Sequence, residues 1–321
     1  MSITSLKLPS YAKINRHLDV LGKRPDGYHE VFTVLQMISL CDDLEFELRT
    51  DGKVTLVCDD PRIPTDETNL VIKAALALQQ KLETPLGADI KLTKRIPAQG
   101  GLGGASSNAA VTLIGLNGLW RAPFRSPHWK HLAGELGADV PFFTGGGRMV
   151  ATGIGATLLP VQDTSRKPLI IITPNARVST PTAYAALNAG SLTTVDAMPI
   201  LSSSFERHFT RDSSQWPEPH NDFERVIFEI EPEIERAKNA LLEAGARSAL
   251  LAGSGSSVFG IVDDEAMRER VLDNLKCEAG WQLFSCETLS RVEYYEALKP
   301  SGFPLFLRSL KTANKKTDTG A

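Results

Sequence analysis

The sequence contains no long apolar run and no surplus of basic residues. No stretch approaches the roughly 18 apolar residues that a membrane span requires. The first residues, Met1 to Lys7, lack the apolar segment of a secretion signal. The 35 Lys and Arg residues are outnumbered by 38 Asp and Glu residues, so the formal charge is −3, whereas nucleic-acid binding needs a basic surface. We therefore expect a cytoplasmic protein that binds neither a membrane nor a nucleic acid.

Cysteine is also scarce. The four cysteines, Cys41, Cys58, Cys277 and Cys286, show no C-x-x-C spacing. This spacing pattern excludes the usual zinc motifs and gives no indication of a disulfide framework. We expect all four to be small buried side chains in a reducing compartment.

A glycine-rich stretch is the most informative part of the chain. Before it, Ile90, Leu92 and Ile96 alternate with polar residues, as in a strand, and helical spacing follows from Ala109 to Trp120. The stretch thus predicts a loop between a strand and a helix. Glycine permits positive φ and close approach of an anion, and a helix N-terminus adds unpaired N–H groups. The residues of the loop are Pro97, Ala98, Gln99, Gly100, Gly101, Leu102, Gly103, Gly104, Ala105, Ser106 and Ser107.

Two common nucleotide motifs do not fit this loop. A P-loop needs a lysine directly after its last glycine, and none follows here. A dinucleotide fingerprint needs an acidic residue about 20 positions further on, and none occurs from Ala98 to Gly134. Ser106, Ser107 and Asn108 could cap the following helix or contact an anion. A tight turn without any ligand remains the alternative.

Three further positions are candidates for chemistry. Lys13 and Asn15 share one face of a predicted strand at residues 11–15. Tyr28 and His29 follow an Asp-Gly turn, where they could grip a planar ligand or pack onto the core. Asp139 precedes Val140-Pro141, which is typical of a helix N-cap. A solvated surface lysine is the corresponding structural alternative for Lys13.

The remaining pattern predicts an α+β fold with two domains, residues 1–164 and 165–321. In the first we expect antiparallel strands, a turn at residues 51–52, and a helix at 70–82 capped by Asp66 or Thr68. In the second, the order β-α-β-β-α-β is that of a split-βαβ, ferredoxin-like domain. A long loop at 190–219 would hold a short helix near Phe205, and the last 20 or so residues would fray. The main expected strands are 31–40, 44–48, 54–58, 90–96, 168–172, one ending at Leu251, 258–262 and 281–288; the helices are 70–82, 109–120, 129–136, one from Pro181 through Leu187, 222–244 and 265–275.

Three segments together resemble the motifs of the GHMP small-molecule kinases, in the same chain order. They are residues 97–107 (PAQGGLGGASS), 137–141 (GADVP) and 251–255 (LAGSG). The resemblance covers about residues 9–262 and departs from the usual loop at Gln99 and Ala105. It implies an N-terminal domain of ribosomal-protein-like α/β fold, a ferredoxin-like C-terminal domain, and a substrate between them.

The resemblance also implies roles for individual residues. The glycine loop would hold the phosphates of ATP, with Asn69 near the adenine. Asp139 would accept the proton of the attacking hydroxyl, and Lys13 would steady that hydroxyl and the developing charge. Mg²⁺ is expected mainly on the nucleotide, with Ser106 or Ser107 as candidate protein ligands, and no metal site built from a carboxylate cage is expected.

The first third of the chain is most similar to family members whose acceptor is cytidine-diphospho methylerythritol, a small molecule of non-mevalonate isoprenoid synthesis. This similarity places Asn15, Tyr28, His29, Thr180 and Tyr184 around the cytidine. It adds the third motif, Gly253, Ser254 and Gly255, to the substrate site of a monomer or weak homodimer. The alternatives are another GHMP kinase acting on homoserine or mevalonate, a catalytically silent nucleotide or metabolite sensor, and an RNA-binding module. The Tyr28-His29 pair disfavours another GHMP kinase, and the presence of Lys13 and Asp139 disfavours a silent sensor. The net charge disfavours an RNA-binding module.

Overall fold

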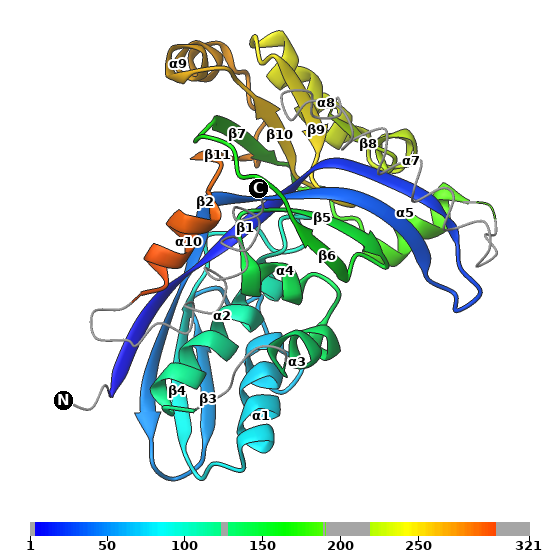
Figure 1. Cartoon of the computed structure of the whole chain (residues 1–321). Helices are drawn as coiled ribbons and strands as arrows, with labels where there is room; N and C mark the ends of the chain where they lie inside the picture. The colour runs from blue at the N-terminus through cyan, green and yellow to red at the C-terminus, as the bar shows by residue number, and fades with distance from the viewer. Residues whose placement is uncertain (1–3, 123–127, 189, 191–218, 300–321) are drawn as a thin grey trace, which may run out of the picture.

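Two β-sheets, each covered by helices, form the molecule. The computed structural model describes residues 4–122, 128–188, 190 and 219–299. A long curved hairpin of β1 (Ser5–Lys23) and β2 (His29–Arg49) runs between the two halves (Figure 1). The Asp-Gly turn predicted at residues 26–27 is the tip of this hairpin.

The first sheet has seven strands in the order β3-β4-β2-β1-β8, with β5 paired to β2 and β6 to β5. The long strand β2 pairs with two strands along one edge: its residues 43–49 pair with β4, and its residues 31–36 pair with β5. The remaining strands are β3 (Val54–Cys58), β4 (Gly87–Thr93), β5 (Arg148–Gly153), β6 (Thr157–Pro160) and β8 (His220–Asn221).

Helices cover one face of this sheet (Figure 1). The apolar side chains of α1 and α2 pack with the inner side chains of β1, β2 and β4 into one large core. The helix α1 is rich in Ala and Leu, which favour helix formation, and α2 is buried along most of its length. The four helices are α1 (Leu70–Leu82), α2 (Gly104–Leu119), α3 (His128–Leu136) and α4 (Val140–Gly145).

The second sheet is antiparallel, with the strand order β11-β7-β10-β9. This is the 4-1-3-2 order of a ferredoxin-like split βαβ, and it confirms the predicted α+β fold class. Helix α8 packs on β9 and β10. The elements are β7 (Pro168–Thr173), α5 (Thr180–Leu187), α7 (Glu224–Ile230), α8 (Pro232–Glu243), β9 (Ser248–Leu251), β10 (Val258–Ile261), α9 (Glu265–Asn274) and β11 (Gln282–Glu287).

Two short elements connect the halves. The strand β8 pairs in parallel with β1. Helix α10 (Arg291–Ala297) packs Tyr294 into the core of the first sheet. A third core lies between the sheets, where Ala12 and Ile14 meet Ile171 and Phe259. The proposed boundary near Thr164 falls in the connection between β6 and β7.

Several sequence predictions were wrong in detail. Residues 31–40 and 44–48 belong to one strand, β2. The strand β3, which follows the turn predicted at residues 51–52, pairs with β4 in parallel and not antiparallel as expected. Asn69, rather than Asp66 or Thr68, caps α1. The helix expected at 222–244 is two helices, because Pro232 lacks the N–H that would continue α7 and instead starts α8.

The cysteine prediction holds in part. All four cysteines are free, but only Cys286 is buried, which raises the pKa of its thiol to about 12. Cys277 is exposed. The helix expected near Phe205, most of the loop at 190–219 and the last 22 residues lie outside the described part of the chain. Within the described part, no helix has the length and apolarity needed to cross a membrane.

Candidate active site

A cavity of about 1120 Å³ lies between the two sheets. The glycine loop, the hairpin tip, the start of α4 and the start of α5 all contribute to its lining. Residues far apart in the sequence, such as Lys13 and Gly253, which are 240 positions apart, therefore face one space. This cavity brings most of the predicted site residues together.

The glycine loop joins β4 to α2, as predicted. Gln99, Gly101 and Gly103 all have φ near +60° to +75°. Gly103 is the N-cap of α2, and no side chain caps that helix. The first N–H groups of a helix have no partner within it, so α2 presents donors and the positive end of its dipole at the loop.

Close packing on both sides fixes the shape of the loop. On one side, the Lys13 N–H of β1 donates to the carbonyl of Leu102 at 2.9 Å. On the other, the Ser257 N–H donates to the carbonyl of Gly100 at 3.2 Å. A Cβ on Gly101 would overlap the carbonyl oxygen of Ala252. The first and third predicted motifs are thus packed backbone against backbone, which requires glycine at this point.

The Lys13 side chain reaches from β1 into the cavity. Lys13 is only 5% exposed, and its Nζ donates to Oδ1 of Asn15 at 2.7 Å. Asn15 in turn donates to Thr33, whose hydroxyl donates to the carbonyl of His17. The two residues share one strand face, while Ala12 and Ile14 enter the core on the other, as the alternation predicted. This chain of hydrogen bonds fixes the position of the ammonium group.

Asp139 lies opposite this ammonium group. Its Oδ2 is 3.7 Å from Lys13 Nζ, and its carboxylate is partly exposed to the cavity. Asp139 occupies the N-cap position of α4, but its side chain accepts no capping hydrogen bond there. The simple capping role therefore does not explain where the carboxylate points.

Aromatic rings gather at the other end of the cavity. His29 from the hairpin tip stacks on Tyr184 of α5, with ring centroids 4.6 Å apart and planes at 21°. Burial, with a contribution from Asp139, raises the pKa of Tyr184 to about 12. Burial and the charge of Lys23 lower the pKa of His29. Tyr28 is 62% exposed, and its N–H is held by Asp26.

The third motif connects these two ends. The hydroxyl groups of Thr180 and Ser254 lie 3.0 Å apart. The side-chain amide of Asn221 donates to the carbonyls of Leu251 and Gly253. Since an added Cβ on Gly253 would lie 3.3 Å from Lys13 Nζ, this turn approaches the catalytic candidates closely.

Comparison with known proteins identifies the family of this chain. The family model described as GHMP kinases N terminal domain matches residues 69–147, and the one described as GHMP kinases C terminal matches residues 204–280. A 4-diphosphocytidyl-2-C-methyl-D-erythritol kinase of Synechococcus sp. (strain JA-3-3Ab) is 39% identical over 82% of this chain and 87% of its own. The chain belongs to this family of GHMP kinases.

A second relative and a solved structure are named as the same kinase. A kinase of the same name from Syntrophus aciditrophicus (strain SB) is 38% identical over 88% of this chain and 99% of its own length. A crystal structure of 4-(cytidine 5'-diphospho)-2C-methyl-D-erythritol kinase superposes with a TM-score of 0.71, at 31% identity, over 88% of this chain and 99% of that chain. The chain is therefore an ATP-dependent kinase of a small molecule.

Two residues predicted for the site of this kinase lie outside the cavity lining, and a third lines the cavity but already has hydrogen-bond partners. Ser107 is 1% exposed and accepts a hydrogen bond from Ser10 at 2.8 Å inside the first core, so it does not line the cavity. Gly255 also lies outside the lining, against Leu251. Asn69 does line the cavity, but its amide already accepts from the N–H of Val71 and donates to the carbonyl of Pro64.

Sequence reasoning also missed several residues of the lining. Arg62, Lys94 and Arg177 bring positive charge to the cavity from three different segments. Lys94 follows β4 directly and pairs with the buried carboxylate of Asp42. A basic residue just before the glycine loop could have indicated Lys94. No local pattern indicates Arg62 or Arg177.

Proposed function

We propose that this kinase transfers the γ-phosphoryl group of ATP to the 2-hydroxyl of 4-diphosphocytidyl-2-C-methyl-D-erythritol. The observation that carries the proposal is the placement of Lys13 and Asp139 within 3.7 Å of each other, in the cavity that the glycine loop lines. The acceptor is the compound named for the relatives at 38–39% identity.

The glycine loop supplies the phosphate site. Its positive-φ residues and the N-terminus of α2 direct backbone N–H groups toward an anion. Gly101 and Gly103 let the loop pack tightly, because a Cβ would meet the carbonyl of Ala252 at Gly101 and the ring of Phe143 at Gly103. The backbone packing of the loop holds these donors in place before the nucleotide arrives, so little ordering cost remains at the moment of reaction.

Lys13 and Asp139 act on the acceptor hydroxyl. The hydroxyl oxygen attacks the γ-phosphorus, the bond from the γ-phosphorus to the bridging oxygen breaks, and ADP leaves. The hydroxyl proton passes to the Asp139 carboxylate. Lys13, fixed by Asn15, stabilises the developing negative charge. Phosphoryl transfer depends mainly on positioning and charge neutralisation, and these groups supply both.

When bound, Mg²⁺ would be carried by the nucleotide and would neutralise phosphate charge. Asp139 is the only carboxylate among the described residues that line the cavity, and the Ser106 hydroxyl also lines it, whereas Ser107 is buried away from it. Such a sparse set fits an ion carried by ATP better than an ion held by the protein alone.

The cytosine of the acceptor binds where the hairpin tip meets α5. Tyr184 offers an aromatic face, and His29 lies next to it as a ring that can stack or hydrogen-bond. Tyr28, exposed at the tip, would close over the base from the other side. We further propose that the protein acts in the cytoplasm as a monomer or weak homodimer, without nucleic acid.

An assay of ADP release tests the acceptor. The purified chain is given ATP and Mg²⁺ with cytidine-diphospho methylerythritol, homoserine or mevalonate, and a reaction without acceptor measures background hydrolysis. We expect turnover above background with the cytidine compound alone. Equal or faster turnover with either of the other two would overturn the proposed acceptor while leaving the kinase family intact.

A further inference from the structure

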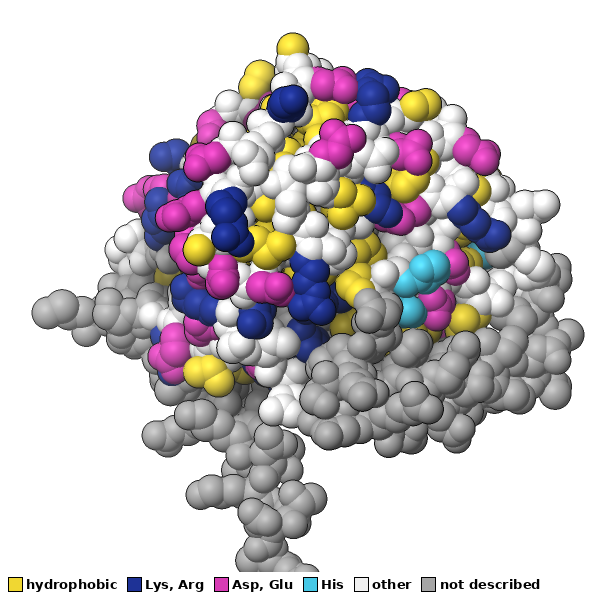
Figure 2. All heavy atoms as spheres, turned by 90° about the horizontal axis from the view of Figure 1, so that it is seen from above, with side chains coloured by type: hydrophobic (Ala, Val, Ile, Leu, Met, Phe, Trp, Pro, Cys, Tyr) yellow, Lys and Arg dark blue, Asp and Glu magenta, His cyan; other side chains and the backbone are white. Residues whose placement is uncertain are grey.

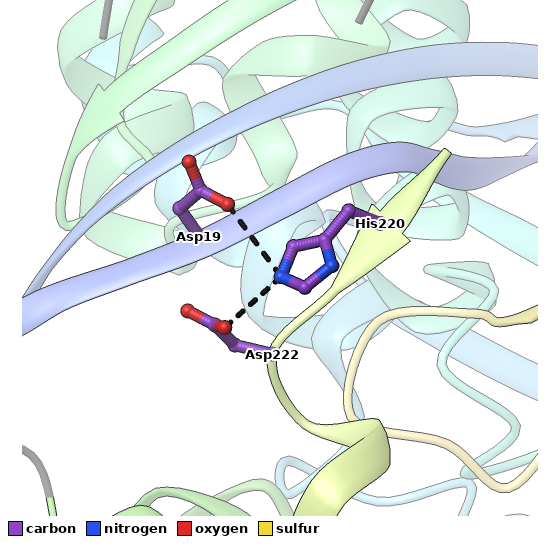
Figure 3. Close-up of side chains that lie close together, drawn as sticks. All are labelled: Asp19, His220 and Asp222. Atoms are coloured by element: carbon purple, nitrogen blue, oxygen red, sulfur yellow. Dashed lines mark hydrogen bonds and ion pairs between the residues drawn. The ribbon is translucent and has the colours of Figure 1, made fainter. Parts of the chain in front are cut away.

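Four side chains converge on one face where β8 lies beside β1. His17 and His220 are partners in the register of the two parallel strands. Side chains two residues apart in a strand point to the same face, so Asp19 and Asp222 follow them on that face. Leu18 and Asn221 point the other way and are buried. The result is a square, formed by the imidazoles of His17 and His220 and the carboxylates of Asp19 and Asp222. Figure 3 shows Asp19, His220 and Asp222.

The ligand atoms of this square lie close together. His220 Nε2 is 3.0 Å from Asp222 Oδ1 and 3.8 Å from Asp19 Oδ1, the two contacts dashed in Figure 3. His17 Nε2 lies 2.9 Å from the same Asp19 oxygen. The group of Asp19, His220 and Asp222 has all three ligand atoms within 4.8 Å of one another, and no other such group occurs in the part of the chain that the structure describes.

These separations match those of metal ligands. Zn²⁺ binds imidazole nitrogen and carboxylate oxygen at about 2.0–2.2 Å in a tetrahedron, which spaces neighbouring ligand atoms roughly 3.3–3.5 Å apart. Three of the six separations among the four ligand atoms are 2.9, 3.0 and 3.8 Å, which lie on either side of this value. Small side-chain shifts would therefore let Asp19, His220 and Asp222 hold an ion, whereas His17 lies outside this close group and would have to turn toward the ion. Two nitrogens and two carboxylate oxygens also suit a first-row divalent cation better than Mg²⁺ or Ca²⁺, which prefer oxygen alone.

The surroundings orient the carboxylate of Asp222. Its Oδ2 accepts the Val20 N–H at 2.7 Å, which leaves Oδ1 facing the histidine. The backbone of Asp222 is itself fixed, since its N–H donates to the carbonyl of Leu18 at 3.0 Å. Such outer hydrogen bonds are the usual means of orienting metal ligands. His17 is 6% exposed, whereas His220 is open to solvent and gives an ion a route in.

We propose that Asp19, His220 and Asp222 hold one divalent transition-metal cation, with Zn²⁺ as the best fit and with His17, which lies beside Asp19, as the candidate fourth ligand. The site is separate from the catalytic cavity, whose lining includes none of the four residues. A bound ion would fasten β8 to β1. Between two of its ligands, Asn221 holds the carbonyls of Leu251 and Gly253, so the same ion would steady the third motif.

Metal binding to the nucleotide-free chain tests the site directly. The chain is stripped with a chelator and dialysed against Zn²⁺ at several concentrations, and bound zinc is measured by elemental analysis. The background variant carries Cys277→Ser, which removes the exposed thiol as a competing ligand. We expect about one zinc per chain. His220→Ala and the near-isosteric Asp19→Asn should each lower the affinity by more than roughly 100-fold, the upper range for loss of an outer-sphere partner.

A matched control is available on the surface. His131 pairs with Glu135 across one helical turn at 3.0 Å, and among the described residues this histidine–carboxylate contact is not part of a group of three candidate ligands. His131→Ala should leave zinc binding unchanged. Co²⁺ gives a second readout, because its visible spectrum distinguishes nitrogen and oxygen ligands from thiolate, and the spectrum should vanish with His220→Ala.

Thermal unfolding separates a metal site from a network of ion pairs. Zinc at saturating concentration should raise the melting temperature of the parent chain, because a ligand that binds only the folded state stabilises it. It should not raise that of Asp19→Asn, whose folding is checked by circular dichroism. If zinc binds the parent, His220→Ala and Asp19→Asn equally, or does not bind the parent, the cluster is only a charge network of His220 between two carboxylates and the proposal fails.

Discussion

The two ends of the catalytic cavity are built differently. At the end that we propose holds the phosphates, the loop is held by backbone hydrogen bonds from β1 and from the turn after β9, and Lys13 is almost fully buried. At the end that we propose holds the acceptor, a hairpin tip with an exposed Tyr28 meets the first turns of α5. A fixed end suits a reaction that depends on precise charge placement. An end made from a hairpin tip can change its side chains to suit another acceptor without disturbing that placement.

On the face shown in Figure 2, acidic and basic side chains are interspersed. The cavity itself is lined by Arg62, Lys94 and Arg177. The four predictions below test how substrate recognition is divided between the two ends of the cavity.

The largest effect is expected at the phosphate end with Asp139→Asn. The amide cannot accept the hydroxyl proton, so kcat should fall by roughly 10²- to 10⁴-fold, the range for loss of a general base. The affinity for ATP should change little. Steady-state kinetics and calorimetric titration with ATP measure the two quantities.

Asp264→Asn is the matched control for that substitution. Asp264 is a true N-cap, whose carboxylate accepts the N–H of Met267 at 2.8 Å. It should alter stability slightly and kcat not at all. Near-normal turnover in Asp139→Asn would return Asp139 to a structural role.

Gly103→Val should abolish measurable ATP binding. A Cβ at this position would lie 2.7 Å from the ring of Phe143 and 3.0 Å from Lys13, in a backbone conformation that β-branched residues avoid. Overpacking of this kind costs about 1–3 kcal/mol, and the displaced loop would no longer direct its N–H groups toward the phosphates. Calorimetry gives the affinity, and circular dichroism shows whether the variant is folded.

Gly27→Ala separates crowding from backbone strain. Gly27 also has positive φ and lines the acceptor end, but a Cβ there would meet nothing within 4 Å. ATP affinity should be unchanged in this variant. Unchanged ATP affinity in folded Gly103→Val would instead show that the loop does not cradle the phosphates.

Loss of an aromatic ring at the acceptor end should have a selective and smaller effect. Base stacking contributes about 1–3 kcal/mol, so Tyr184→Ala should raise KM for the cytidine acceptor roughly 5- to 150-fold and leave KM for ATP nearly unchanged. Because Tyr184 also packs on Phe223, some stability should be lost. Tyr28→Ala should raise the acceptor KM without that loss, since Tyr28 is largely exposed.

Equal increases in both KM values for Tyr184→Ala, or lower stability with no change in either KM, would remove the tyrosines from cytosine recognition. Tyr184→Phe sharpens the result. It keeps the ring and should behave like the parent if stacking, and not the hydroxyl, holds the base.

The smallest effect concerns pH. Burial disfavours the charged form of His29 and lowers its pKa, so the ring is neutral at pH 7 and above. As the pH falls through this lowered pKa, the ring becomes charged, and the acceptor KM should rise. The contribution of His29 to folding stability has the same sign: it is present above the ordinary pKa of histidine and lost on acidification.

A pH profile of the acceptor KM for the parent and for His29→Gln checks this prediction. The glutamine variant should lack the His29-dependent rise. An identical acid limb in both proteins would assign the titration to another group.

Local pattern was sufficient where local forces decide the structure. The helix at residues 70–82 begins and ends where its Ala and Leu spacing predicted, and the order of strands in the second sheet followed from its elements. The break expected near residue 42 did not occur, because Asp42 is not in a turn. Its buried carboxylate accepts the N–H groups of Arg95 and Ile96, which no local pattern could reveal.

The site was predictable to the extent that its groups sit in motifs. Lys13, Asp139 and most of the glycine loop lie in the cavity as expected. The stacking of His29 on Tyr184 joins residues 155 positions apart, and the square formed by β1 and β8 joins residues about 200 apart. Such contacts depend on how the two halves pack, so composition and periodicity alone did not indicate them.

The position of α10 has a consequence for the order in which the chain can fold during synthesis. Tyr294 is fully buried in the core formed by the first sheet, where its hydroxyl donates to the carbonyl of Phe143 and its ring lies against Gly146. Domains generally fold as they leave the ribosome, the first before the second. In this protein, the core of the first sheet is incomplete until residues up to about 298 have been made. All strands of the second sheet, in contrast, are complete by Glu287. The half that is translated first is therefore the last to complete its hydrophobic core.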